Sequence, residues 1–494
     1  MFVLPRSVIR NSLLIVVTIV VLFCIKDTLF ELLTGISSLA SEGSHRHDAT
    51  EKPASGRNVT KRELMLVQML FRHGHRAPFM LYPYDPNSEL DWKEGMGMLT
   101  QLGRLQHYAM GVHLQNRYKD FITTNPKRRY IKKKKGASAN CSSWVIDKEK
   151  DNITFRTLLY FAIGEKIEMI NSNNFRCQYG VYCFIAGLYE PTKEFSFTDE
   201  LRWQPIISRQ ADFKGKSVLT RGKCKISDDE SYALKRSIEA NATRAKYHDL
   251  YNFWSKNSGR LIDSWVLASD LGKTISCEKE YNLTIPDWTQ KYWDEFSMQT
   301  GIAYYFNYGT KLIQRYRIGP LIGYMIERMN DRILGQTEKK FYIFSAHGSN
   351  IACLLLALDQ YNWKGPPYAS TVVLELWKED DEDYSIRWLF FNSTNPEKRV
   401  DPPYPLVLEG CGGEFCPFGK FQDIVRRLIP DNWKKECNDS ANRLRFMPFE
   451  STTHIPGLAP YMNSSARSSI HIMHVQYIVM TFLLICIHLY SYYK

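Results

Sequence analysis

The residues of this chain with the clearest chemical potential lie in one short stretch, Phe-Arg-His-Gly-His-Arg-Ala-Pro, which spans residues 71–78. Guanidinium groups match the oxygens of a tetrahedral oxyanion, and a neutral imidazole between them can attack phosphorus. Arg72, His73 and Arg76 therefore predict a phosphate site. A lone Arg-His-Gly triplet would as readily be a basic surface turn, but the complete octet behind an apolar run is much more specific.

Two apolar runs are expected to position this chemistry. Residues 64–70 precede the octet and are typical of a buried strand in an α/β sheet, and residues 341–346 form a second such run that ends at His347. Ligands of open α/β sheets bind at the carboxyl ends of the strands. Charged side chains at such a strand end are costly unless they face a ligand, so the octet is expected to line a binding site.

The surrounding sequence predicts helices and further strands. Thr100 is placed to cap a helix that ends near Tyr118, because apolar residues follow it at helical spacing. Residues 155–170 are also predicted to be helical, and residues 371–377 and 385–391 are predicted to be strands. Together these elements indicate an α/β chain.

The octet resembles the signature Arg-His-Gly-x-Arg-x-Pro of the histidine acid phosphatases. The Leu-Thr-x-x-Gly sequence at residues 99–103 also matches that family, and the resemblance covers about residues 62–440. It implies an α/β fold, namely a three-layer sandwich with a central mixed sheet flanked by helices, plus a smaller, mostly helical cap domain. The phosphatase-like domain is expected to span residues 62–445, with the cap inserted at about residues 120–335.

The resemblance also implies a reaction and a role for each site residue. The chain would hydrolyse phosphate monoesters through a phosphohistidine intermediate on His73. Arg72 and Arg76 would bind the phosphoryl oxygens, and His347 would donate a further hydrogen bond. The alternative for His347 is an ordinary histidine whose hydrogen bonds are satisfied at a strand end. No cofactor is expected, and no His/Cys cluster has the spacing of metal ligands.

Two departures from the family pattern weaken the expected activity. Gly348 stands where the family has an acidic residue that protonates the leaving oxygen, a contribution typically worth ~10²–10⁴-fold in rate. A third phosphate-binding arginine has no clear match before residues 156–157, where Lys150 lies nearest and lacks the guanidinium fork. Asp85 is a candidate substitute acid. The alternative function is therefore that of a catalytically impaired, membrane-tethered protein that binds phosphate esters or another partner.

Cysteines and glycosylation sequons indicate the secretory pathway. The chain contains eleven cysteines. Its Asn-x-Ser/Thr sequons lie at Asn58, Asn140, Asn152, Asn241, Asn282, Asn392, Asn438 and Asn463. Such acceptor sites are used in secreted proteins, where cysteines are more often bridged than free. We expect a membrane-associated protein that faces the lumen or the extracellular space, at the lysosome or the cell surface.

The resemblance implies a disulfide pattern as well. Two disulfides are expected, and they join Cys411 to Cys416 and Cys224 to Cys437. Thr371 stands where the family often has the partner of Cys277. Cys277 is therefore expected either to pair with Cys353 or to remain a free thiol.

Both ends of the chain are apolar and are predicted to lie outside the folded domain. Residues 1–40 contain a 14-residue apolar run that suits a signal peptide or a signal anchor, since a helix of that length spans roughly 21 Å. Residues 475–494 are typical of a GPI signal or of a short transmembrane anchor. Residues 41–61 and 446–474 are predicted to be linkers.

The formal net charge is +12 at pH 7, and the sequence pI is near 9.0. Part of the excess lies in the basic run at residues 127–135, which is predicted to be a solvated loop, with a protease-sensitive site as the alternative. Because part of the excess charge lies in this one run, no nucleic-acid partner is predicted. The expected partners are a phosphate monoester and a membrane, and a homodimer stays open because members of the family are often dimers.

Overall fold

The computed structural model describes residues 62–122, 167–191, 193, 196, 198–211, 219, 224–379, 383–392 and 402–438. Several predictions fall outside this part of the chain: the terminal segments and linkers, the basic run, Lys150 and residues 156–157. Within the described ranges, no helix is both long and apolar enough to cross a membrane.

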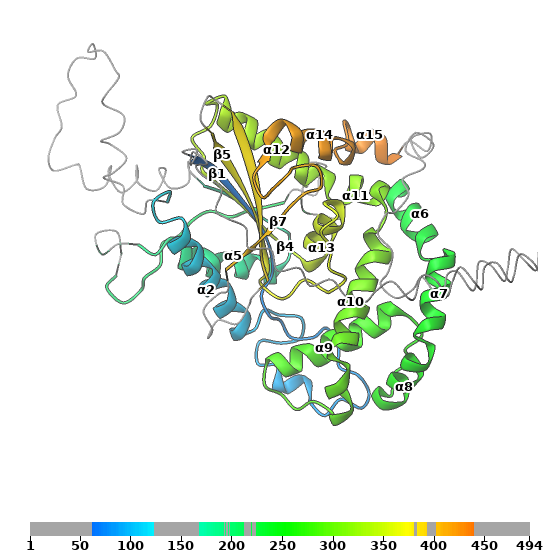
Figure 1. The fold of residues 1–494 in the computed structure, drawn as a ribbon. Helices are drawn as coiled ribbons and strands as arrows, with labels where there is room; N and C mark the ends of the chain where they lie inside the picture. Colours follow the sequence, from blue (N-terminus) through cyan, green and yellow to red (C-terminus); the bar gives the residue numbers. More distant parts are fainter. Residues whose placement is uncertain are drawn as a thin grey trace, which may run out of the picture. The chain divides into compact units, whose positions relative to one another are not determined.

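One mixed sheet forms the centre of the fold (Figure 1). Its strands are β1 (Glu63–Arg72), β2 (Ile167–Asn171), β3 (Arg209–Gln210), β4 (Phe341–Ala346), β5 (Thr371–Lys378), β6 (Tyr384–Phe391), β7 (Tyr404–Leu406) and β8 (Cys416–Pro417). The spatial order is β3-β2-β4-β1-β5-β6-β7, and β8 pairs with β6. β3, β2, β4 and β1 pair in parallel in that order. β5 pairs in antiparallel fashion with β1 and with β6, and β6 pairs in the same way with β7.

The parallel pairing of β1 and β4 brings the two predicted strand ends together. Arg72 lies opposite Ala346 in the register, so the residues that follow, His73 and His347, leave the sheet at the same edge. β2 is the parallel neighbour on the other side of β4, and its last residue, Asn171, ends at nearly the same level. Three strand ends therefore meet at one edge, which is where open α/β sheets bind ligands.

Helices cover both faces of the sheet. They are α2 (Gln101–Arg117) and α5 (Phe175–Leu188) on one face, and α12 (Gly319–Ile333), α13 (Gly348–Ala357) and α14 (Phe418–Val425) on the other (Figure 1). Side chains of β1 alternate between the faces, so that Val67 and Met69 pack with α2 and α5, while Leu66 and Leu70 join the opposite core. This three-layer arrangement confirms the predicted fold class.

The predicted helix after the octet is present as α2. The Thr100 side chain accepts a hydrogen bond from the Gly103 backbone N–H, and the helix ends with Tyr118 as its C-cap. α2 lies very close to α5, since a Cβ atom on Gly111 would be only 2.1 Å from the carbonyl oxygen of Phe184. A side chain at residue 111 would therefore push the two helices apart.

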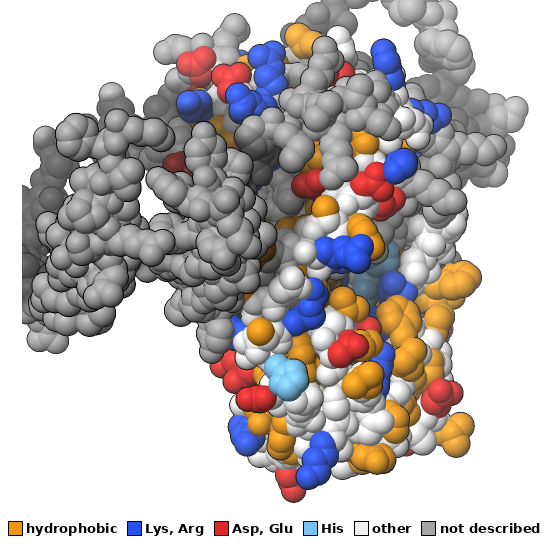
Figure 2. All heavy atoms as spheres, turned by 90° about the vertical axis from the view of Figure 1, so that its right-hand side faces the viewer, with side chains coloured by type: hydrophobic (Ala, Val, Ile, Leu, Met, Phe, Trp, Pro, Cys, Tyr) orange, Lys and Arg blue, Asp and Glu red, His pale blue; other side chains and the backbone are white. Residues whose placement is uncertain are grey.

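The cap is mostly helical, as expected. Its helices are α6 (Lys225–Leu234), α7 (Ile238–Lys246), α8 (His248–Ser258), α9 (Trp265–Glu280), α10 (Trp293–Tyr308) and α11 (Lys311–Arg317). Short 3-10 helices, η1 (Glu89–Asp91), η2 (Asp287–Tyr292) and η4 (Arg426–Leu428), lie in the connections. Figure 2 views the side on which α6, α7 and α8 lie, and it shows basic, acidic and apolar side chains interspersed there.

The prediction of a helix at residues 155–170 is wrong for its described end, because Ile167–Asn171 forms β2. Buried and half-buried side chains alternate along this strand, and pairing with the distant β4 overrides the helical pattern of the local sequence. β2, β3 and α5 also lie within the range expected to form the cap, residues 120–335. They belong instead to the sheet and to one of its flanking layers.

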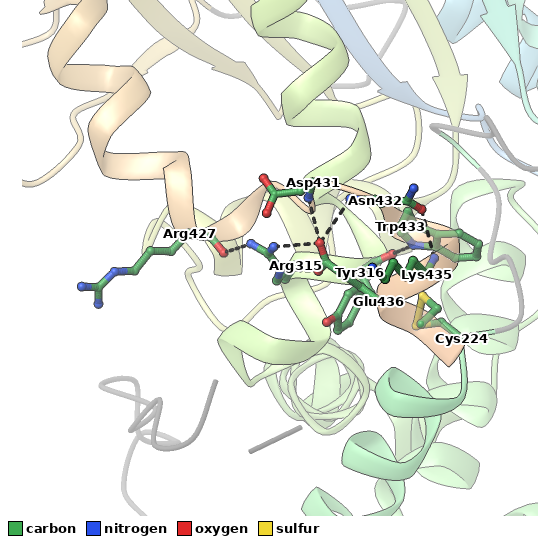
Figure 3. Close-up of polar contacts among 10 residues, drawn as sticks. Cys224, Arg315, Tyr316, Arg427, Asp431, Asn432, Trp433, Lys435 and Glu436 are labelled. Carbon is green, nitrogen blue, oxygen red and sulfur yellow. Dashed lines mark hydrogen bonds and ion pairs between the residues drawn. A yellow bond between two sulfur atoms is a disulfide. The ribbon is translucent and has the colours of Figure 1, made fainter. Parts of the chain in front are cut away.

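The C-terminal helix α15 (Trp433–Asn438) is fastened to the cap by a disulfide and a buried ion pair (Figure 3). Cys437 bonds to Cys224, which precedes α6. Arg315 of α11 donates from Nε and Nη2 to the two carboxylate oxygens of Glu436, at 3.0 and 3.2 Å. The same carboxylate accepts two backbone N–H groups at the start of α15. We refer to these contacts as the C-terminal clamp.

The cysteine pairing follows the expected pattern. The disulfides are Cys224–Cys437 and Cys411–Cys416. Cys277 is a buried free thiol and forms no disulfide bond with Cys353, so the free-thiol alternative is confirmed. The sulfur of Cys277 lies 2.9 Å from the hydroxyl oxygen of Tyr368.

Candidate active site

A cavity of about 570 Å³ opens at the edge of the sheet where β1 and β4 end. Among the residues that line it are Arg72, His73 and Arg76 from the segment after β1, and His347 from the segment after β4. The structure therefore brings together the four residues that the sequence predicted for the site. Arg176, from the first turn of α5, joins them.

The imidazole of His73 is held in a neutral, oriented state. The ring is buried, and Nδ1 lies 2.9 Å from the carbonyl oxygen of Gly74, which can only accept a hydrogen bond. Nδ1 therefore carries the proton, and Nε2 keeps its lone pair. Burial, followed by the charges of Arg72 and Arg176, holds the pKa of His73 well below its ordinary value of 6.5. This is the form in which a histidine can act as a nucleophile.

The two arginines of the octet are oriented by aromatic rings. The guanidinium of Arg72 lies 3.8 Å from the centre of the Tyr368 ring and donates from Nη1 to the carbonyl oxygen of Pro366. Its Nε is buried and has no hydrogen-bond partner within the described part of the chain. The guanidinium of Arg76 lies 4.0 Å from the centre of the Phe79 ring. Neither guanidinium forms an ion pair with a carboxylate among the described residues, so both hold donors at the cavity.

His347 is the N-cap residue of α13 and lies next to His73, with the two ring centres 5.6 Å apart. Its Nε2 is 3.0 Å from the hydroxyl of Ser172, in the segment after β2. Its Nδ1 is 3.5 Å from Nη2 of Arg176. The second predicted histidine is thus anchored by residues from a third strand end, and it faces the same cavity as the first.

Arg176 is a site residue that the sequence did not predict. It follows β2 in the helix capped by Asn174, and its buried Nε has no partner among the described residues. Burial and the positive charges of Arg76 and Arg72 lower its pKa. Lys150, the residue considered for a third phosphate-binding cation, lies outside the described residues. A correct prediction of β2 would have revealed Arg176, because residues that follow a strand parallel to β4 lie at the same edge of the sheet.

Asp85 and His75 lie away from the cavity. Asp85, the candidate substitute acid, accepts hydrogen bonds from the backbone and side chain of Asn87 and is not part of the cavity lining. His75, the second histidine of the octet, is fully buried between the hydroxyl of Thr100, at 2.7 Å, and the carbonyl oxygen of Cys277, at 3.0 Å. Burial lowers the pKa of His75 to about 4, so it is a neutral structural residue that ties the octet to α2 and α9.

The described lining of the cavity is strongly basic. Its cationic side chains are Arg72, Arg76, Arg176, Lys273 and Arg317. No aspartate or glutamate is among the described residues that line it. Gly348, where the resemblance implied the loss of an acidic residue, lines the cavity beside His347. The arrangement favours a dianionic phosphate group but lacks a carboxyl group next to it.

The fold is shared with solved structures of phytases. The structure is similar to the phytase from Citrobacter braakii, with a TM-score of 0.52 and 16% identity over 75% of this chain and 99% of that one. It is equally similar to the Hafnia alvei phytase in complex with myo-inositol hexakis sulphate, with a TM-score of 0.53 and 15% identity over 75% and 98% of the two chains. At these identities the likeness establishes the fold alone.

Sequence comparison gives the family. Residues 177–391 match the histidine phosphatase superfamily (branch 2). Human prostatic acid phosphatase is 30% identical over 389 residues, which cover 77% of this chain and 89% of the relative. Lysosomal acid phosphatase of Xenopus laevis is 27% identical over 390 residues, which cover 77% and 80%. The chain belongs to branch 2 of the histidine phosphatase superfamily, as the octet predicted, and its acid phosphatase relatives support phosphomonoester hydrolysis.

Proposed function

We propose that this protein hydrolyses phosphate monoesters through a phosphohistidine intermediate on His73. The observation that carries the proposal is the state of that ring: buried, neutral, tethered through Nδ1 to Gly74, and surrounded by guanidinium groups. Nε2 attacks phosphorus, and the electron pair of the breaking P–O bond leaves with the alcohol oxygen. Water then displaces the imidazole and releases inorganic phosphate.

The phosphoryl oxygens are bound by Arg72, Arg76 and Arg176. The unpartnered Nε donors of Arg72 and Arg176 support this role, since each would gain a hydrogen bond only when an anion enters the cavity. His347 supplies a further donor beside the nucleophile. Positioning and charge stabilisation of this kind are the main contributions to phosphoryl transfer.

A second candidate function is a phosphate-ester-binding protein with little turnover, tethered to a membrane. The observation that favours it is Gly348, since no described carboxyl group lines the cavity to protonate the leaving oxygen. A lumenal or secreted location is supported by the named relatives, which are lysosomal and prostatic acid phosphatases. Attachment to a membrane and formation of a homodimer are further parts of this proposal.

Hydrolysis of an aryl phosphate by the purified full chain separates the two functions. His73→Ala is expected to lower kcat by at least about 10³-fold, because it removes the nucleophile. His248→Ala, at an exposed histidine of α8, is the matched control and is expected to leave kcat unchanged. Equal rates for the wild-type chain and His73→Ala would contradict the catalytic proposal. Retention of inorganic phosphate binding by a chain without turnover would favour the second function.

A further inference from the structure

The space above Gly348 is already occupied by another polar group. A Cβ atom on Gly348 would lie 2.9 Å from the hydroxyl oxygen of Tyr304, and 3.2 Å from both Cδ and Nε of Arg72. Tyr304 comes from α10, and its side chain lines the cavity together with His73 and His347. A phenol hydroxyl therefore stands where a side chain at residue 348 would begin.

The hydroxyl of Tyr304 is available to a ligand. It makes no hydrogen bond to any residue that the structure describes. The ring centre of Tyr304 lies 6.5 Å from that of Tyr308 and 5.7 Å from Nζ of Lys273. The next residue of α10 differs in this respect, since the hydroxyl of Tyr305 donates to Glu239 at 2.9 Å. A half-buried hydroxyl without a partner, facing a phosphate cavity, is suited to bind part of the substrate.

We propose that Tyr304 is the catalytic residue that donates a hydrogen bond, and then a proton, to the leaving oxygen of the ester, in place of the missing carboxyl group. This inference rests on the proposed function. In the first step the bond from Nε2 of His73 to phosphorus forms, the P–O bond breaks, and the leaving oxygen takes the phenol proton of Tyr304. In the second step the phenolate accepts a proton from the attacking water as the P–N bond breaks, which restores both residues.

The proposal predicts a dependence on the leaving group. A phenol is a weaker acid than a carboxylic acid, so it assists a departing oxygen less completely. The assistance matters most for alkyl esters, whose alkoxides are strongly basic, and least for aryl esters, whose phenolates leave unaided. The distance between Tyr304 and the Gly348 position also predicts that a carboxylate at residue 348 and the Tyr304 hydroxyl compete for the same space.

The first test measures kcat/KM of the full chain with an alkyl phosphate and with a nitrophenyl phosphate. Tyr304→Phe is expected to lower the alkyl value by about 10²-fold and the aryl value by less than about threefold. Tyr305→Phe is the control and is expected to leave the ratio of the two values unchanged. Thermal unfolding and competitive inhibition by inorganic phosphate check that Tyr304→Phe keeps its fold and its binding site.

An equal loss on both esters, or no loss on either, would overturn the assignment of Tyr304. In that outcome the effect of His73→Ala on aryl phosphate still reports on the proposed function by itself. The failure of one proposal is thus distinguishable from the failure of the other.

The second test combines two substitutions. Gly348→Asp alone is expected to lower activity on the alkyl ester, because its side chain meets the Tyr304 hydroxyl and Arg72. The double variant Gly348→Asp with Tyr304→Phe lacks that hydroxyl. Its kcat/KM on the alkyl ester is expected to exceed that of Tyr304→Phe by about tenfold or more. If Gly348→Asp raised alkyl activity while Tyr304 was intact, the hydroxyl would not occupy the donor position and the proposal would be wrong.

Discussion

At the scale of single residues, the site works through the surroundings of each side chain. His73 and His75 lie two positions apart in the octet, but of the two only His73 lines the cavity. Both ring nitrogens of His75 form hydrogen bonds, one with Thr100 and the other with the carbonyl oxygen of Cys277. The pKa of each imidazole is lowered chiefly by burial. For His73 the neighbouring arginines add to the effect, so the proposed phosphate ligands also keep the proposed nucleophile neutral in acid.

The pH profile of aryl phosphate hydrolysis should reflect this coupling. Since the neutral ring is the active form and its pKa is lowered, activity should persist below pH 6.5, the ordinary histidine value. Arg176→Gln removes one of the lowering charges, so the pKa of His73 rises and the acid limb of kcat/KM moves to higher pH. Arg202→Gln, at an exposed arginine paired with Glu190, is the control. An acid limb that stays in place in Arg176→Gln would refute the coupling.

At the scale of elements, parallel strand pairing positions the site, and the C-terminal clamp fastens α15 to the cap. Pairing of β1, β4 and β2 brings three strand ends to one edge. On the cap side, Arg315 of α11 holds Glu436 of α15 in a nearly dry environment. Burial alone would raise the pKa of Glu436, but hydrogen bonds from Arg315 and from backbone N–H groups outweigh it and lower the pKa.

The clamp should make stability depend on acidity. Because the folded pKa of Glu436 is below the ordinary 4.5, its contribution is complete above that value and is lost as the pH falls through the folded pKa. Glu436→Gln is expected to cost about 3 kcal/mol of unfolding free energy at pH 7, since it leaves Arg315 buried without its counter-charge. Asp359→Asn, which breaks the more exposed Lys311–Asp359 pair of the same helix α11, should cost about 1 kcal/mol or less. Urea unfolding at pH 7 and pH 4 measures the loss of unfolding free energy in each variant. Equal losses in Glu436→Gln and Asp359→Asn would contradict the role of the clamp.

At the scale of the whole molecule, a buried carboxyl group favours the folded state in acid. Glu278 of α9 is fully buried, and its carboxyl group interacts with the side chains of Asp85 and Asn87. Burial, with the nearby Asp85, raises the pKa of Glu278 to about 9. The folded chain therefore keeps this proton at neutral pH.

Thermal unfolding over a range of pH tests this effect. A raised folded pKa gives a stability contribution that is complete below the ordinary value of 4.5 and declines as the pH rises toward about 9. Glu278→Gln, which stays neutral, should flatten that part of the curve and raise Tm at pH 8 relative to the wild-type chain. Glu295→Gln, which removes a carboxyl group in the first turn of α10, is the control. A wild-type slope in Glu278→Gln would show that another group carries the pH dependence.

Much of the fold and part of the site could be predicted because their signals are local. The apolar runs before the octet and before His347 became β1 and β4, and Thr100 capped α2 as expected. The segment that became β2 was predicted as helix, because its short alternation is decided by pairing with β4, more than 170 residues away. That error concealed Arg176, which depends on β2 for its place at the site.

The sequence by itself determined the immediate surroundings of the proposed nucleophile, since Arg72, His73 and Arg76 lie close together at the end of one buried strand. Only the tertiary structure decided which further groups surround it. Arg176 reaches the cavity because β2 pairs with β4, and Tyr304 reaches Gly348 because α10 packs against α13. Residue types near one another in sequence can be judged from local patterns, whereas groups brought together by sheet order and helix packing depend on contacts distributed over the whole chain.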